Sequence, residues 1–507
     1  MGEKIVIIGG IAAGTSAAAK IRRKSEEAEV IIYEKDKYIS YGTCGLPYFV
    51  SGKIKNLNKL LINTPKGFKK RFNVEVRCQC EVKKIDAEKK VLEIEDLKNG
   101  KVFKDRYQKL IITTGSMPVR LKFGGQESEN IFVLKTLKDA IRLKKFLKAE
   151  TGGHAVIIGG GFIGLELIEA FKRRNMPVTI IEKTGQLLPM FDRPIIKFLE
   201  NYLETKGINI LKNDEVTNLN VRNDLVKSVK TKSGRKIDSS LVFFGIGTKP
   251  NTKLAKDCGI NTGKNGSIEV DEFMKTNIRD IFAAGDCCEC LNNITGHKSS
   301  FNLASIANRQ GRVAGYNAAG GREKFEGSIV TSIIRVLDIA IAKTGISLQE
   351  ARSAGINAQN IELHYGSHAG YYPGAEMLHM LVVYEKETGK ILGGQAIGRE
   401  AVDKKIDILS TAIKNNLKVW ELANLDLCYQ PAYGSAKDSI NILGMIAENL
   451  KKGEMELIDI DEFKEIRENK GIILLDVRNE YRKDDSHFSR THQSRARLCL
   501  QPRWRLC

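Results

Sequence analysis

Two glycine-rich turns, each entered from an apolar run, constrain the fold of this chain more than any other feature. In the first, the run Lys4–Ile8 leads into the turn at 9–14 (GGIAAG), and Glu34 stands twenty residues beyond Gly14. A strand, a tight turn, a helix start and an acid at the end of the next strand place a dinucleotide pyrophosphate on a helix N-terminus and the acid on a ribose hydroxyl. Ile11 replaces the central glycine of this pattern.

The second turn repeats the pattern with all three glycines. The run Ala155–Ile158 leads into the turn at 159–164 (GGGFIG), and Glu182 lies eighteen residues beyond Gly164. Two such units predict an α/β fold with two Rossmann-like nucleotide-binding domains. Because both units lie on one chain, we expect two dinucleotides that exchange electrons.

A single cysteine follows the first unit. Cys44 lies in the segment 40–48 (SYGTCGLPY) and is the candidate for a third redox-active group that exchanges electrons with the two dinucleotides. A lone cysteine is ordinarily a small buried core residue, and this is the alternative interpretation. No Cys-x4-Cys pair lies near the first turn, so we do not expect a two-cysteine dithiol.

The formal net charge of +20 is compatible with several kinds of binding partner. It suits nucleic acid or an anionic membrane, but no recognition motif supports either partner. A lysine-rich surface explains the charge more simply, and a phosphate-bearing substrate would be drawn to local basic patches. No apolar run reaches the ~18 residues that a membrane span needs. We therefore expect a cytoplasmic protein with no nucleic acid partner and no membrane insertion.

The ten cysteines lack the spacing of a disulfide scaffold. The sequence Cys287-Cys288-Glu289-Cys290 resembles a metal site at first sight, but close packing is the simpler interpretation. We expect no metal.

Shifts in the apolar pattern predict the domains. One nucleotide-binding domain comprises 1–117 and 244–326, and the other, 118–243, is inserted within it. From 327 to 450 the pattern changes to alternating strands followed by helices, which predicts an α+β domain.

The segment 455–507 begins like a folded domain and then loses its pattern. Ile472–Arg478 is typical of a buried strand, but the apolar periodicity ends after Tyr481. Some 50 residues bury too small a core to fold alone. We expect an incomplete domain that is disordered after 482, and we interpret the change as a frameshift near Asp484, which resequencing would test.

Several separated motifs together resemble the FAD-dependent pyridine nucleotide-disulfide oxidoreductases of the single-cysteine class. The two turns, Cys44, the turn Thr113-Thr114-Gly115 and the pair Gly285-Asp286 carry this resemblance, which spans residues 3 to about 452. The family implies a FAD-binding domain, an NAD(P)-binding domain and a dimerisation domain at 327–450.

Three further motifs resemble one branch of this family, the coenzyme A (CoA) disulfide and CoA persulfide reductases. They are 44–48 (CGLPY), 370–375 (GYYPGA) and 429–438 (YQPAYGSAKD). The NADH oxidases share much of this pattern. The segment 455–481 resembles the start of a rhodanese domain, although the expected active loop is absent.

The resemblance implies FAD at the first turn. Glu34 would bind the adenosine ribose, Val82 the adenine through its backbone, and Asp286 the ribityl hydroxyls. A helix starting near Ala304 would direct its N-terminus at the flavin pyrimidine, where partial positive charge stabilises the reduced anion. The remaining expected FAD contacts are Gly9, Gly10, Ala12, Ala13, Gly14, Lys35, Thr114 and Gly115.

A nicotinamide dinucleotide would occupy the second turn. Glu182 favours NADH, because a carboxylate accepts a hydrogen bond from a 2′-hydroxyl and repels a 2′-phosphate. Lys183 beside it weakens that preference, so NADPH stays open. Gly247 would lie near the nicotinamide. The other expected contacts are Gly159, Gly161, Phe162, Ile163 and Gly164.

CoA carries phosphates and needs cations. Ser16, Lys20 and Arg23 are spaced by four and three residues and share one face of the first helix. The resemblance implies that they bind CoA, although solvated surface charge is the alternative for each basic residue. The other implied contacts are Ser40, Thr43, Arg71, Asn302 and Lys437.

Cys44, Tyr371 and Tyr429 are the candidate catalytic residues. The resemblance implies that NAD(P)H reduces the flavin and that the flavin reduces Cys44, held as a mixed disulfide with CoA. The thiolate then attacks the next disulfide or persulfide sulfur. The two tyrosines, from the partner subunit of a homodimer, would protonate the leaving thiolate, or else pack at the dimer interface.

Two other functions stay open. In an NADH oxidase, Cys44 would cycle through a sulfenic acid, with oxygen or peroxide as the acceptor. A flavin-bound redox sensor would be reduced by NADH without turnover.

Overall fold

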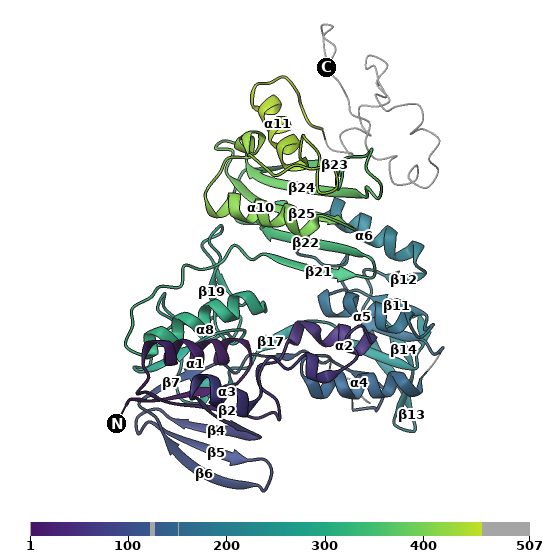
Figure 1. The fold of residues 1–507 in the computed structure, drawn as a ribbon. Coiled ribbons are helices and arrows are strands. Elements are labelled where there is room, and N and C mark those ends of the chain that lie inside the picture. Colours follow the sequence, from purple (N-terminus) through teal and green to yellow (C-terminus); the bar gives the residue numbers. More distant parts are fainter. Residues whose placement is uncertain (1, 122–126, 151, 459–507) are drawn as a thin grey trace.

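The computed structural model describes residues 2–121, 127–150 and 152–458, which build three five-stranded sheets (Figure 1). The first sheet is wholly parallel, and its strands in spatial order are β18 (Ile281–Ala283), β7 (Lys109–Ile112), β1 (Lys4–Ile8), β2 (Glu29–Glu34) and β3 (Glu75–Cys78). Its central strand, β1, is almost entirely buried because four of its five residues are Ile or Val.

Helices α1 (Ala12–Lys24) and α8 (Ala304–Ala318) pack side by side on this sheet (Figure 1). Their backbones approach closely because α8 carries glycine at the contact. A Cβ on Gly311 would lie 2.3 Å from the carbonyl oxygen of Ala13. The nearby elements are α3 (Pro65–Phe72) and an antiparallel meander of β4 (Cys80–Asp86), β5 (Val91–Asp96) and β6 (Lys101–Arg106).

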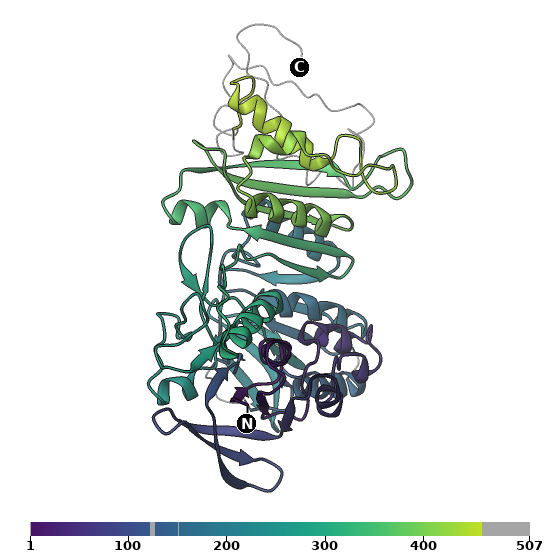
Figure 2. The same cartoon turned by 60° about the vertical axis from the view of Figure 1, so that its left-hand side comes forward.

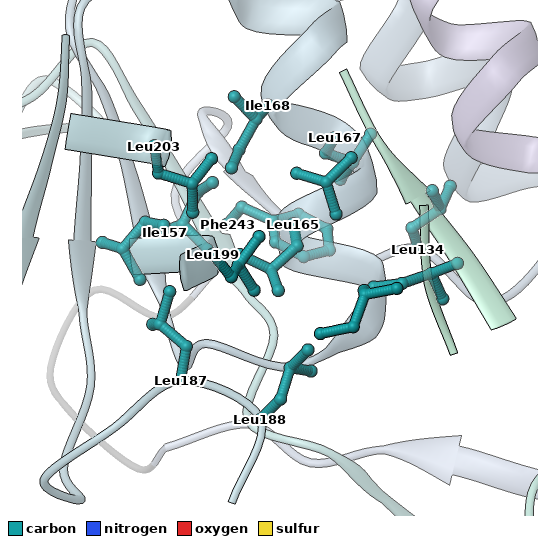
Figure 3. Close-up of a cluster of buried hydrophobic side chains, with 14 of the residues drawn as sticks. Leu134, Ile157, Leu165, Leu167, Ile168, Leu187, Leu188, Leu199, Leu203 and Phe243 are labelled. Carbon is teal, nitrogen blue, oxygen red and sulfur yellow. The ribbon is translucent and has the colours of Figure 1, made fainter. Parts of the chain in front are cut away.

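The second sheet is also parallel, with the order β12 (Ile208–Leu211), β11 (Val178–Ile181), β10 (Ala155–Ile158), β16 (Leu241–Phe244) and β9 (Ile131–Phe132). Its helices are α4 (Leu137–Ala149), α5 (Phe162–Lys172) and α6 (Arg193–Thr205). Leu165, Leu199 and Phe243 meet in the core between sheet and helices, and all three are fully buried (Figure 3). An antiparallel sheet adjoins it, formed by β13 (Val216–Arg222), β14 (Leu225–Thr231) and β15 (Lys236–Asp238).

The chain crosses between the two parallel sheets twice. It leaves through β8 (Ser116–Pro118) and returns through β17 (Thr248–Pro250), and the two crossings pair as an antiparallel ribbon. The helix α7 (Lys253–Asp257) and the short strands β19 (Cys290–Leu291) and β20 (Lys298–Ser299) follow. One nucleotide-binding unit is therefore inserted in the other, as the sequence predicts.

The third sheet is antiparallel, with the order β21 (Ser332–Val336), β22 (Ile339–Gly345), β25 (Ile391–Gly398), β24 (Met377–Glu385) and β23 (Ala358–Gly366). It lies above the other two sheets in both views (Figures 1 and 2). The helices of this part are α9 (Leu348–Ser353), α10 (Val402–Lys414), the 3-10 segment η3 (Val419–Asn424) and α11 (Ser439–Lys451).

The predicted α/β class with two parallel nucleotide-binding sheets and an α+β unit is confirmed. Strand β18, which leads to Asp286, begins only at Ile281, because Thr276 turns back on Ile281 and Asp280 adopts a left-handed conformation (φ +66°). Residues 459–507, which include most of the rhodanese-like segment, lie outside the described part, and the exact domain boundaries stay predictions. Among the described residues, no helix has the length and apolarity that a membrane crossing requires.

Candidate functional site

The first glycine turn has a backbone that only glycine adopts easily. Gly9 has φ +106°, and a Cβ there would lie 2.3 Å from the carbonyl oxygen of Thr113 at the end of β7. A Cβ on Gly14 would lie 1.9 Å from the carbonyl oxygen of Gly9. Ile11 is the N-cap of α1 and makes no side-chain hydrogen bond to the first amides of that helix, the groups that a phosphate would bind.

Glu34 closes this turn from the end of β2. Its carboxylate accepts hydrogen bonds from the amides of Gly10 (2.7 Å) and Asp36 (2.9 Å). Burial raises the pKa of Glu34, and the two amide donors oppose that rise. The next residue, Lys35, is exposed.

The second turn has the same construction. Gly159 has φ +95°, and a Cβ there would lie 2.7 Å from the carbonyl oxygen of Gly245. Glu182 follows β11 and accepts from the amide of Gly160 (2.7 Å) and from both the amide (2.8 Å) and hydroxyl (2.9 Å) of Thr184. Gly161 caps α5 with no side-chain hydrogen bond. The predicted contacts Phe162, Ile163 and Gly164 form the first turn of α5.

The crossing ribbon brings predicted contacts of both nucleotides together. The Thr114 hydroxyl donates to the carbonyl of Asn251 (2.6 Å), and the Asn251 amide donates to the carbonyl of Gly115 (2.9 Å). Gly115 (φ +69°) and Gly247 (φ +102°) each have open space where a Cβ would stand. The predicted contacts of the two nucleotides therefore lie together at this ribbon.

Asp286 lies just beyond β18, and its Oδ2 accepts from the Ser116 hydroxyl (2.9 Å) and from Lys135 Nζ (2.9 Å). Because both donors bind Oδ2, Oδ1 of Asp286 is the oxygen that would accept a hydrogen bond from a ribityl hydroxyl. Sequence reasoning missed Lys135, which follows β9 in the other nucleotide-binding unit and belongs to no motif. Ala304, another predicted contact, is the first residue of α8, in the predicted position at the helix N-terminus.

The cysteines after Asp286 are buried. The Cys287 thiol donates to the carbonyl of Ala284 (3.4 Å), and burial raises the pKa values of Cys287, Cys288 and Cys290. Over 2–121, 127–150 and 152–458, no group of three His, Cys, Asp or Glu side chains is arranged to hold a metal ion.

Cys44 is exposed in the 3-10 turn η1 (Thr43–Gly45), directly before α2 (Leu46–Ser51). Although α2 lies between β2 and β3 of the first sheet in sequence, it packs against α4 and α5 of the second nucleotide-binding unit (Figure 1). Lys53 Nζ lies 2.8 Å from Glu169 of α5, and Lys144 Nζ of α4 lies 3.6 Å from the centre of the Phe49 ring. Cys44 therefore lies on a segment that connects the two nucleotide-binding units.

Glu166 of α5 is a second residue that sequence reasoning missed. Burial raises its pKa to about 7, and a hydrogen bond with the Tyr48 side chain opposes that rise. Tyr48 lies on α2, four residues after Cys44. A glutamate near the start of a helix gives no sequence signal of burial, because the burial comes from α2.

Two of the three predicted CoA contacts on α1 face α8. The Ser16 hydroxyl donates to Asn308 Oδ1 (2.7 Å), and Lys20 Nζ lies 4.7 Å from the centre of the Tyr316 ring. Arg23 is exposed near the end of the same helix.

The other predicted contacts are spread more widely. Ser40 is buried beside the first turn, where its amide donates to the carbonyl of Gly10 (2.8 Å). Asn302 Nδ2 donates to the Thr248 hydroxyl (2.6 Å) on the crossing ribbon. Arg71 is exposed on α3. Thr43 adjoins Cys44. Val82, the predicted contact of the FAD adenine, is buried in β4.

Tyr371 and Tyr429, the two candidate catalytic tyrosines, lie in contact. Their hydroxyls are 2.8 Å apart, and the side chains are 76% and 47% exposed. The hydrogen bond to Tyr429 raises the pKa of Tyr371. Lys437 lies on the same loop system, where its carbonyl accepts from the Tyr365 hydroxyl (3.0 Å).

Within one subunit, this tyrosine pair lies far from Cys44. The loops that carry it adjoin β23 and α11, at the top of Figure 1, whereas α2 lies in the lower part.

Comparison with known proteins agrees with this geometry. The family model "Pyridine nucleotide-disulphide oxidoreductase" matches residues 3–311, and the dimerisation domain of that family matches residues 331–439. The chain is 31% identical to the NADH oxidase of Methanocaldococcus jannaschii over 445 residues, which are 87% of this chain and 97% of the relative.

Two further similarities concern sulfur substrates. The chain is 30% identical to the coenzyme A disulfide reductase of Staphylococcus aureus over 446 residues, 88% of this chain and 100% of the relative. The solved structure of an NAD-dependent persulfide reductase from A. fulgidus has a TM-score of 0.87 at 36% identity and covers 90% of this chain and 85% of that one.

The chain therefore belongs to the pyridine nucleotide-disulphide oxidoreductase family. It is an oxidoreductase of the kind that uses FAD and a nicotinamide dinucleotide, and its dimerisation domain supports a homodimer.

Proposed function

We propose that this enzyme reduces CoA disulfide or CoA persulfide with NAD(P)H through Cys44. The position of Cys44 carries this proposal. The thiol is exposed on a segment that starts from the first nucleotide-binding unit and packs against α5, the helix that begins at the second glycine turn.

The residues present fit two dinucleotides. Each turn is a cradle that a Cβ would fill, and each has an acid fixed by backbone amides where a ribose would bind. Bound FAD would supply the transfer of two electrons from the nicotinamide to sulfur. Glu34 and Glu182 would bind the two adenosine riboses, and Asp286, held by Lys135, would bind the ribityl chain.

The Cys44 thiolate attacks one sulfur of CoA disulfide, so a mixed disulfide forms and one CoA thiolate leaves. Two electrons from NAD(P)H then cleave the mixed disulfide, which releases the second CoA thiolate and restores the Cys44 thiolate. With protons added to both leaving groups, one NAD(P)H and one proton yield NAD(P)⁺ and two CoA thiols.

Tyr371 and Tyr429 would act on the partner subunit's thiol, because they lie far from Cys44 of their own subunit. Their linked hydroxyls can pass a proton to a leaving thiolate. Ser16, Lys20 and Arg23 would bind the phosphates of CoA.

Anaerobic turnover tests the proposal. Purified protein mixed with NADH and then with CoA disulfide or CoA persulfide should consume NADH, and Cys44→Ser should abolish this consumption. Cys258→Ser, a matched change of a partly exposed thiol near α7, should retain it. NADH consumption that persists in Cys44→Ser would refute the role of Cys44.

A second function, NADH oxidase, is favoured by the similarity to the M. jannaschii protein. Consumption of NADH that starts only when oxygen is admitted would establish it. The cytoplasmic location that the sequence predicts is part of the same proposal, and cell fractionation tests it.

A further inference from the structure

An ion pair lies beside the acid of the second glycine turn. Lys183 directly follows Glu182, and its Nζ lies 2.8 Å from Oε2 of Glu215. The segment before β13 that carries Glu215 is held against β11, because the Asp214 amide donates to the carbonyl of Glu182 (3.2 Å). The Lys183 side chain is 77% exposed, so a ligand at the edge of the sheet can reach it.

The carboxylate of Glu182 cannot move aside for a bulky anion at low cost. Three donors from Gly160 and Thr184 hold it in place. A fixed carboxylate favours a ribose 2′-hydroxyl and repels a 2′-phosphate, which carries a charge of about −1.5 to −2. Lys183 is the adjacent cation that would offset this repulsion.

Glu215 determines how much of the positive charge of Lys183 is available to a 2′-phosphate. Its hydrogen bond and charge raise the pKa of Lys183, and Lys183 in turn lowers the pKa of Glu215. Lys232 approaches the other oxygen of Glu215 at 3.6 Å. Asp214, the acid beside Glu215, accepts from the Ser233 hydroxyl (2.6 Å).

Two further cations near this edge are engaged elsewhere. Arg193 and Lys212 both pair with the buried Glu200, at 3.3 Å and 2.7 Å. Lys183 and Lys232 therefore share the partly exposed Glu215, and Lys183 is the closer of the two and the one that directly follows Glu182.

We propose that Glu215 determines cofactor specificity by acting through Lys183. With the pair closed, the charge of Lys183 is offset and NADH is preferred. When a 2′-phosphate displaces Glu215 from Lys183, NADPH is accepted, so the enzyme uses both dinucleotides with a preference set by the pair. This inference rests on the proposed function, because it requires a dinucleotide at the second turn.

Two variants and one control test the inference. Glu215→Gln should raise the ratio of NADPH to NADH affinity roughly threefold to fivefold, the range expected for an exposed charge pair. Lys183→Ala should lower the ratio by a similar factor. Glu326→Gln breaks a comparable exposed pair with Lys414 (2.6 Å) in a distant part of the chain and should leave the ratio unchanged.

Affinities for NAD⁺ and NADP⁺ are measured by calorimetry on the FAD-loaded enzyme, alongside the rates of flavin reduction by NADH and NADPH. In the Lys183→Ala background, Glu215→Gln should have little further effect, because Glu215 acts through Lys183. An undiminished effect of Glu215→Gln in that background would overturn the inference, as would an unchanged ratio in both single variants. Failure of the parent enzyme to bind either dinucleotide would instead refute the proposed function.

Discussion

Replacing Glu166 by glutamine should stabilise the protein at pH 8 and have much less effect at pH 5. Burial raises the pKa of Glu166 from its ordinary value near 4.5 to about 7, so the folded protein resists ionisation of this group. An acid whose pKa is raised by folding contributes stability that is fully present below the unfolded pKa and is lost as the pH rises through the folded pKa. The loss therefore falls between about pH 4.5 and pH 7.

The expected change in the free energy of unfolding follows from the shift in the pKa of Glu166. Each pKa unit corresponds to about 1.4 kcal/mol, so the full shift of the Glu166 pKa is worth about 3.5 kcal/mol once the group is ionised. Because the side chain is only partly buried, we expect about 2 kcal/mol at pH 8. Glutamine keeps the size of the side chain and can still accept the hydrogen bond from Tyr48, so little else changes.

The assay is urea unfolding of the FAD-loaded parent and variant at pH 5 and pH 8. The compared quantity is the difference between the two proteins at each pH, so other titrating groups cancel. Glu326→Gln serves as the control, because Lys414 lowers the pKa of Glu326 and the difference should not change over this range. A Glu166→Gln difference that is equal at pH 5 and pH 8 would refute the reasoning.

Two further predictions follow from contacts in the structure. Gly311→Ala places a Cβ 2.3 Å from the backbone oxygen of Ala13, so it should separate α1 from α8 and destabilise the protein by about 1–3 kcal/mol, measured by the urea midpoint. Tyr371→Phe and Tyr429→Phe each remove one hydroxyl of a pair 2.8 Å apart and should lower kcat for CoA disulfide at least tenfold. Stopped-flow reduction of the flavin by NADH should stay unchanged, and a slower reduction would place the tyrosines in a different step.

The features that sequence predicts well are local ones. Each glycine turn specifies its own strand, helix start and acid within about 30 residues, which is the length of one βαβ unit. The structure accordingly places Glu34 and Glu182 at the ends of the strands where the pattern predicts them. The inserted arrangement was also predictable, because each crossing segment directly follows a buried strand, β7 or β16, and glycine and proline lie between that strand and the end of the crossing.

The features that sequence misses depend on contacts between the two nucleotide-binding units. Lys135 meets Asp286 across 151 positions of the chain, and the segment around Lys135, just before the N-cap of α4, carries only a helix-capping signal and no nucleotide-binding motif. The burial of Glu166 arises only because α2, from the other unit, packs on α5. No periodicity within a single element encodes such a contact.

The two glycine turns have the same construction, although Ile11 replaces the central glycine of the first, so we expect the choice between dinucleotides to come from the surroundings of each turn. Both acids accept from the amide of the second glycine at 2.7 Å. Beyond Glu34 the exposed Lys35 follows, whereas beyond Glu182 the cation Lys183 is paired with Glu215. A turn that binds the pyrophosphate contacts a group that all dinucleotides have in common, so it cannot distinguish one dinucleotide from another. The choice among dinucleotides is therefore made at the strand ends next to the acid, where single charges such as Glu215 can change without altering the fold.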